Sequence, residues 1–357
     1  MRARAYRSLV VALAMSAVAT SMAWAGTTSS PGPLDIQHKP KVQESVQAVY
    51  RQQNALFKAG QVILQPGISY AYSDSNALTL NGFLALGAIF LGQINVSQVQ
   101  SNIETLSLQT SYAPTDNLEL SLTIPYLARQ STYVSVGANS SSLQASQQNV
   151  TNKGEIGDVS AALYYQLPGS SGGDATIWNL TAKAPTGRGP YGIPVVTQAA
   201  NNNLSYPQSL PTGNGVWSVS TGLSFIKPAS PAILFGSLSY TYNIPRSFGN
   251  ISSTTTPQPG EVAGGNSVSF GGGTAFALNR RVSLTLSMDE TFIAETSIKP
   301  AGGSWQAVVG SSGNAAVLNL GMSYAESRRV TVVTNVAVGL TKDAPNIDLS
   351  VTVPTIF

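Results

Sequence analysis

Two glycine-rich segments have the spacing of catalytic or cofactor-binding motifs. Gly169, Ser171 and Gly173 match G-x-S-x-G, which exposes a serine nucleophile on a strand-to-helix turn and needs a histidine later in the chain. Gly187, Gly189 and Gly192 match G-x-G-x-x-G, which holds a dinucleotide pyrophosphate where it opens a helix. Neither has its context: the single histidine, His38, precedes Ser171, and Pro190 within the second motif and Pro194 after it prevent a regular helix. We expect neither to be a site.

Other catalytic or metal-binding groups are scarce. The 357-residue chain has no cysteine and one histidine, which excludes disulfides, thiolate metal sites and thiol nucleophiles. Asp289 and Glu290 are adjacent in an alternating segment, so their carboxylates point to opposite faces and do not share a substrate. We therefore expect no enzyme activity, no metal and no cofactor.

The N-terminus has the features of a secretory signal peptide. Three arginines precede an apolar stretch from Leu9 to Met22, and Ala23-Trp24-Ala25 forms an A-x-A cleavage site. Cleavage near Ala25 removes three of the 19 basic residues and none of the 16 acidic ones. The mature chain is then neutral, which argues against nucleic-acid binding.

Residues 26–60 are expected to form a periplasmic leader and one short helix. Prolines at 31, 33 and 40 mark a flexible leader. An apolar seam at helical spacing follows and ends before Gly60; its members are Val42, Val46, Val49 and Leu56. The seam fits packing on the protein body, a plug in a channel, or an oligomer contact.

From residue 61 onward the period changes to two, which predicts strands. The alternating segments are 61–74, 101–113, 117–131, 155–167, 175–186, 214–226, 232–246, 264–278, 281–294, 314–325, 329–341 and 346–357. Their polar face carries small uncharged residues, and only 10% of the chain is charged. A soluble sandwich would show charge to water, whereas a membrane barrel turns its apolar face to lipid.

We therefore predict an all-β fold: a transmembrane antiparallel β-barrel of about 12 strands over 61–357. Short and long connections alternate along the chain, as in barrels with short periplasmic turns. The last strand ends on Phe357, which resembles the signal read by the barrel assembly machinery. These features predict the outer membrane of a Gram-negative cell.

Three stretches resemble an outer-membrane family named for the meta-pathway of phenol degradation. They are NLELSLTIPYLAR at 117–129, GEIGDVSAALYYQL at 154–167 and APTG at 184–187. The resemblance implies a transporter-like or channel-like barrel. Functional-amyloid exporters are similar to this family. Resemblance to them implies a helix before a twelve-stranded barrel, and assembly as a homo-oligomer.

Five charged residues fall on the polar face of the strands and are the candidate pore-lining residues: Glu119, Arg129, Asp158, Lys183 and Asp289. We expect Asp158 and Lys183 to form an ion pair, or else to contact a solute. With so few charges we expect no strong ion selectivity. Residues 83–91 (FLALGAIFL) interrupt a long connection, and residues 77–100 fit a loop, a plug or extra strands.

The sequence thus favours a channel for small, weakly charged, aromatic or hydrophobic solutes. The alternative is an exporter of an amyloid-type or unfolded polypeptide. The expected partners are lipid, the barrel assembly machinery and the transported molecule, with a homo-oligomer as a further possibility.

Overall fold

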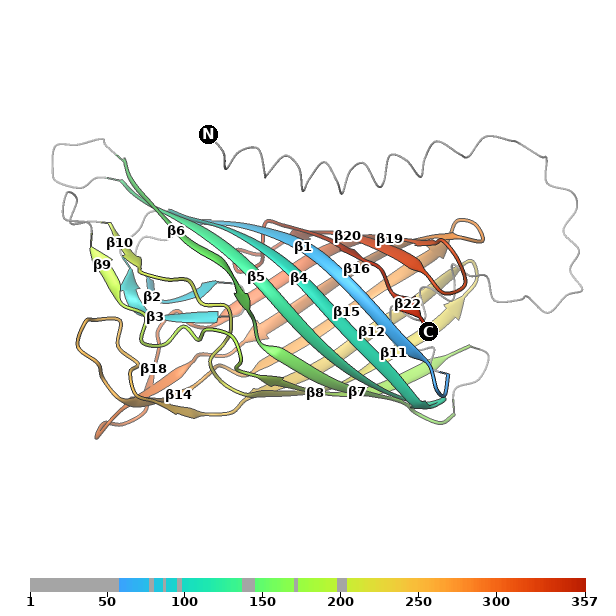
Figure 1. The fold of residues 1–357 in the computed structure, drawn as a ribbon, viewed down its shortest axis with the longest axis horizontal. Helices are drawn as coiled ribbons and strands as arrows, with labels where there is room; N and C mark the ends of the chain where they lie inside the picture. Colours follow the sequence, from blue (N-terminus) through green and yellow to red (C-terminus); the bar gives the residue numbers. More distant parts are fainter. Residues whose placement is uncertain are drawn as a thin grey trace, which may run out of the picture. The chain divides into compact units, whose positions relative to one another are not determined.

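The computed structural model describes residues 58–76, 80–85, 88–94, 98–136, 145–169, 173–197 and 204–357. Twelve strands of these residues form one closed antiparallel β-barrel (Figure 1), which confirms the predicted fold class. The wall strands are β1 (Val62–Asn76), β4 (Gln98–Thr115), β5 (Leu118–Val136), β7 (Val159–Gln166), β8 (Ala175–Ala184), β11 (Ser218–Ala229), β12 (Ala232–Asn243), β15 (Ser267–Ala277), β16 (Val282–Ile293), β19 (Gly313–Ala325), β20 (Thr331–Gly339) and β21 (Ile347–Thr352).

The barrel closes where the last strand meets the first. β21 pairs with β1 from Gly67↔Thr352 to Tyr72↔Ile347, and the short β22 (Thr355–Ile356) pairs with the start of β1. This seam has six registered pairs with β21 and two with β22. On its other side β1 has fifteen pairs with β4. β6 (Ala145–Ile156) extends the wall by pairing with the second half of β5.

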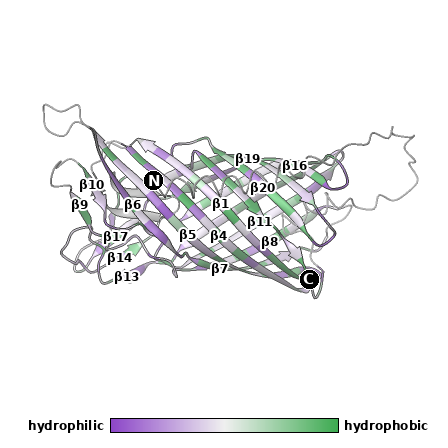
Figure 2. Cartoon of the chain, turned by 45° about the horizontal axis from the view of Figure 1, so that its top comes forward, coloured by the Kyte–Doolittle hydropathy of each residue, from purple (hydrophilic) through white to green (hydrophobic). Residues whose placement is uncertain are grey.

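The outer face of the barrel is apolar. Large exposed apolar side chains recur at outward positions of the wall, as on β5 at Leu120, Leu122, Ile124 and Tyr126. Many of the intervening, inward positions are small, polar and buried, as at Ser121 and Ser131. Figure 2 shows hydrophobic residues recurring along the wall strands. An apolar band of this extent is the pattern of a barrel wall in contact with lipid.

The long connections carry small sheets outside the barrel wall. β2 (Leu80–Ala85) and β3 (Ala88–Ile94) form a separate hairpin, so the apolar run at 83–91 adds no strand to the wall. A four-stranded sheet combines two other connections. Its strands are β13 (Arg246–Phe248), β14 (Gly260–Ala263), β17 (Ser297–Pro300) and β18 (Gln306–Ala307). β9 (Val195–Thr197) pairs with β10 (Ser205–Pro207).

The proposed signal peptide at 1–25 and the apolar seam of Val42, Val46, Val49 and Leu56 lie outside the described residues. None of the described residues forms a helix long and apolar enough to cross a membrane.

Candidate functional site

The connection between β8 and β11 is folded onto the inner wall of the barrel. We call its described residues, 185–197 and 204–217, the inner loop. Its side chains Ile193, Leu204 and Leu210 form a buried cluster with Val99, Tyr133 and Val150 of β4, β5 and β6. On β4 and β5 these partners share the inward parity of Ser101 and Ser131. The inner loop therefore occupies the part of the lumen that this wall encloses.

Two of the predicted pore residues bind the backbone of the inner loop. Arg129 is 5% exposed, and its Nη1 donates to the carbonyl oxygen of Pro211. Asp158 accepts two backbone hydrogen bonds, from Gly187 N at 3.1 Å and from Asn214 N at 2.7 Å. A carboxylate or guanidinium bonded to backbone groups holds a segment more strongly than a neutral hydrogen bond does. These two side chains hold both ends of the inner loop.

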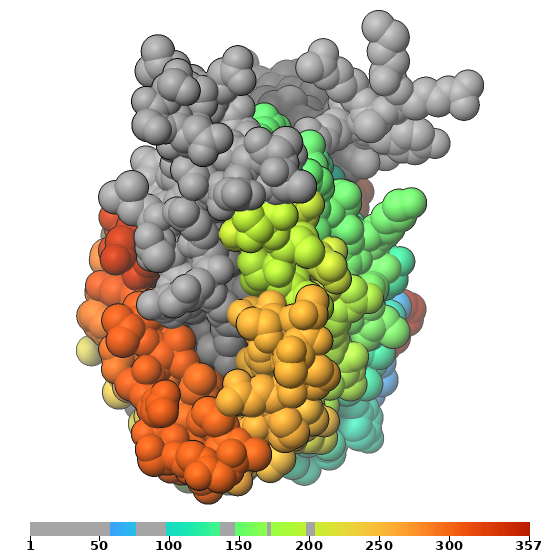
Figure 3. All heavy atoms as spheres, turned by 90° about the vertical axis from the view of Figure 1, so that its left-hand side faces the viewer, coloured from blue at the N-terminus to red at the C-terminus, as the bar shows by residue number. Residues whose placement is uncertain are grey.

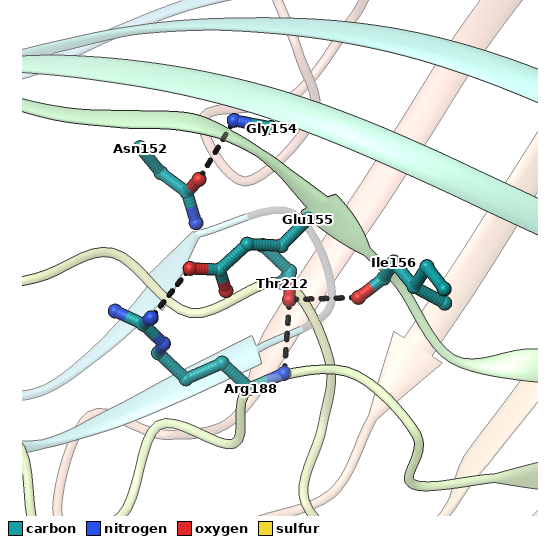
Figure 4. A network of polar contacts seen from close by, with 6 residues as sticks. All are labelled: Asn152, Gly154, Glu155, Ile156, Arg188 and Thr212. Atoms are coloured by element: carbon teal, nitrogen blue, oxygen red, sulfur yellow. Dashed lines mark hydrogen bonds and ion pairs between the residues drawn. The ribbon is translucent and has the colours of Figure 1, made fainter.

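A second set of polar contacts joins the inner loop to the end of β6 (Figure 4). Arg188 forms an ion pair with Glu155. The Arg188 backbone nitrogen donates to Thr212 Oγ1 at 2.9 Å, and that hydroxyl donates to the Ile156 carbonyl at 3.2 Å. Thr212 thus bridges the two arms of the loop and the wall.

Glycines of the inner loop, among them Gly187 of the second motif, allow this close approach. A Cβ on Gly187 would lie 2.9 Å from the backbone of Thr212 and Gly213. A Cβ on Gly213 would lie 2.0 Å from Asp158 Oδ1. The motif therefore occurs in a loop where two backbone segments and a carboxylate pack tightly, and β8 is followed by this loop instead of a helix.

The inner loop is also tied to the residues that follow β12. The Tyr191 ring packs on Phe248 with centroids 4.6 Å apart, and burial raises the pKa of Tyr191. Val195 N donates to Ser253 O at 2.7 Å, and Arg246 Nη1 donates to Gly215 O at 2.9 Å. In Figure 3 the yellow-green inner loop accordingly lies beside the gold residues around 250–262 at this end of the barrel.

The other predicted pore residues are placed differently. Lys183 is within electrostatic range of Asp158, but the described residues contain two ion pairs, Arg188–Glu155 and Lys299–Glu261. The expected Asp158–Lys183 ion pair is therefore wrong, because backbone amides already bind the Asp158 carboxylate. Glu119 is 4% exposed on the inner face of β5.

Asp289 belongs to a polar strip across three neighbouring strands. Asn319 Nδ2 donates to Asp289 Oδ2 at 2.7 Å, and Asn335 Nδ2 donates to Asn319 Oδ1 at 3.2 Å. A Cβ on Gly271 would lie 2.0 Å from Asp289 Oδ1, so this glycine gives the carboxylate its space. Within the described ranges, no three acidic or histidine residues gather as metal ligands would.

An inward apolar cluster was not anticipated from the sequence. It lies at the inner positions of β8, β11, β12 and β15 and consists of Ala175, Ile177, Ile226, Ile233, Phe235 and Ala275. The available signal was broken alternation, since Phe225-Ile226 and Ile233-Leu234-Phe235 are continuous apolar runs. Such runs place apolar side chains on both faces of a strand. The lumen thus has one apolar wall and, at Asp289, one polar wall.

No protein-family model matches the chain. Among solved structures, the fold is similar to an outer-membrane channel from Pseudomonas putida F1, with a TM-score of 0.53 and 13% identity over 92% of this chain and 100% of that chain. A weaker likeness is to the transport unit of the autotransporter AIDA-I from Escherichia coli, with a TM-score of 0.43 and 11% identity over 91% and 92% of the two chains. The first likeness shows that the chain has the fold of an outer-membrane β-barrel.

Proposed function

We propose that the protein is a channel of the Gram-negative outer membrane that passes small, weakly charged, aromatic or hydrophobic solutes and catalyses no reaction. The observation that carries the proposal is a closed barrel with an apolar outer face and an inner loop fixed inside its lumen. Such a loop narrows the path through the lumen. The segments at 117–129, 154–167 and 184–187 support membership of the phenol meta-pathway family.

The lining of the lumen supports the solute class. Ile177, Ile226 and Phe235 supply an apolar surface on one side, and few charges project into the interior. Transfer of an aromatic or aliphatic solute from water to such an apolar wall is favourable. A polypeptide exporter is less well supported, because the inner loop occupies space that an extended chain would need.

The expected partners follow from the same location. Lipid would contact the outer face, and the barrel assembly machinery would read the strand that ends at Phe357. The seam of Val42, Val46, Val49 and Leu56 remains a predicted plug or oligomer contact.

Single-channel conductance in planar bilayers tests the proposal. The full chain in KCl should give small, discrete current steps. Gly213→Ala places a Cβ against Asp158, which should loosen the inner loop and raise the step size. Gly249→Ala is the matched control, since a Cβ there meets nothing within 4 Å, and its steps should equal those of the wild type. Correctly folded barrels that give no current steps would contradict the channel function.

A further inference from the structure

Arg129 is a buried cation with an incomplete set of partners. Its Nη1 donates to Pro211 O, whereas its Nε has no hydrogen-bond partner. The two ion pairs of the described residues involve other side chains. A buried charge without a counter-charge is strongly destabilising. The presence of one in the barrel therefore suggests that it binds an anion.

Asn152 supplies a second unpartnered donor at the same place. It is the registered partner of Arg129 in the β5–β6 ladder and is 8% exposed. Its Oδ1 accepts from Gly154 N at 3.0 Å, which fixes the orientation of the amide. Its Nδ2 therefore carries the free donors and has no partner. In Figure 4 the Nδ2 end of Asn152 points away from the Gly154 nitrogen.

Two unpartnered donors on registered residues, one of them cationic, lack an acceptor that carries negative charge. On the inner face Ser131 lies next to Arg129 along β5, and its hydroxyl is hydrogen-bonded to that of Ser101 at 2.7 Å. Two further inner-face residues supply an apolar surface: Tyr133 follows Arg129 by four residues, and Val150 precedes Asn152 by two. Both belong to the buried cluster that the inner loop covers. The donors of Arg129 and Asn152 therefore form a candidate anion site beside an apolar surface.

We propose that Arg129 and Asn152 bind the carboxylate of an apolar solute, whose body packs beside Tyr133 and Val150. The proposal rests on the channel function and names its substrate class as hydrophobic or aromatic monocarboxylates. The guanidinium that would bind the carboxylate also holds Pro211. Solute binding therefore competes with this contact of the inner loop and favours its release.

Binding of benzoate to the purified full-length protein, measured by calorimetry, tests the proposal. Acetate keeps the carboxylate and lacks the apolar body, and benzyl alcohol keeps the ring and lacks the charge. Asn152→Asp retains the acceptor for Gly154 N and places a carboxylate of the protein beside Arg129, so it should occupy the site. Arg129→Met removes the charge and every guanidinium donor.

The matched control is Asn149→Asp, on the same strand and the opposite face. Asn149 Oδ1 accepts from Thr132 Oγ1 at 2.8 Å, and an aspartate can accept the same bond. Heat-modifiable gel migration verifies that each variant is a folded barrel. Asn152→Asp should remain folded because it gives Arg129 a counter-charge.

We expect benzoate to bind more tightly than acetate or benzyl alcohol. Asn152→Asp should lower the affinity for benzoate by about tenfold or more, because its carboxylate occupies Arg129 and repels the carboxylate of the ligand. Asn149→Asp should bind benzoate as the wild type does. Equal binding of benzyl alcohol and benzoate, equal binding of acetate and benzoate, or unchanged benzoate affinity in Asn152→Asp would each overturn the proposal. KCl conductance measured in parallel reports the channel function independently.

Discussion

At the scale of single residues, adjacent acidic side chains have different surroundings. Asp289 faces the lumen and accepts from Asn319. Glu290 follows it and takes the outward parity of Met288 and Phe292, which are exposed apolar residues. One carboxylate can act on permeating ions, and the other lies on the lipid-facing side of the same strand.

Asp289→Asn should therefore lower the permeability of the channel to cations relative to anions. A unit charge acting over about 4 Å in water contributes about 1 kcal/mol, so the permeability ratio should fall by up to about fivefold. The reversal potential across a KCl gradient measures the change. Glu290→Gln is the control and should leave this potential unaltered; an equal shift in both variants would show that Asp289 does not face the ion path.

At the scale of elements, the inner loop depends on the carboxylate of Asp158. Asp158→Asn replaces a charged acceptor by a neutral one, which should weaken the bonds to Gly187 N and Asn214 N by about 1–2 kcal/mol. The inner loop should then open more often, and limited proteolysis within 187–214 should proceed about fivefold faster or more.

The control for this prediction is Asp174→Asn, which changes an exposed residue of the β7–β8 turn. Its cleavage rate should match that of the wild type. Unchanged cleavage in Asp158→Asn would mean that Arg129, Arg188 and Arg246 hold the inner loop without this carboxylate.

The wall elements could be predicted from the sequence because a two-sided environment imposes a period of two. The alternating segment at 281–294, for example, becomes β16 at Val282–Ile293. The predicted segment at 155–167 contains parts of two strands instead, since β6 ends at Ile156 and β7 begins at Val159. Most of β6 is polar (ASQQNVTNKGEI), so apolar alternation does not reveal this strand or the two-residue break that follows it.

The candidate site was less predictable. Parity along the strands placed Arg129 and Asp158 on the inner face, but their partners are backbone groups of Pro211, Gly187 and Asn214. Backbone amides and carbonyls are the same in every residue type, so no residue pattern identifies which of them a distant charge will bind. The inner loop could be recognised in the sequence only as a long connection rich in glycine and proline.

At the scale of the whole barrel, the orientation in the membrane is open to a direct test. The chain has no cysteine, so one introduced thiol is unique. Thr256→Cys lies in an exposed long connection, and Arg280→Cys lies in an exposed short turn. An impermeant maleimide should label the first in intact cells and the second only after lysis. The reverse result would invert the topology.

The closing seam is one of the shorter ladders of the barrel wall, as are the six-pair β20–β21 and β5–β7 ladders. β1 is joined by fifteen registered pairs to β4, but by six to β21 and two to β22. Between β21 and β22 lies Pro354, which has no backbone N–H to donate. When an atomic force microscope pulls on the C-terminus, β22 should therefore leave β1 first, and β21, which has six registered pairs with β1 and six with β20, should leave both neighbours next at low force. The β1–β4 ladder should still be intact when the circle of strands has become an open sheet.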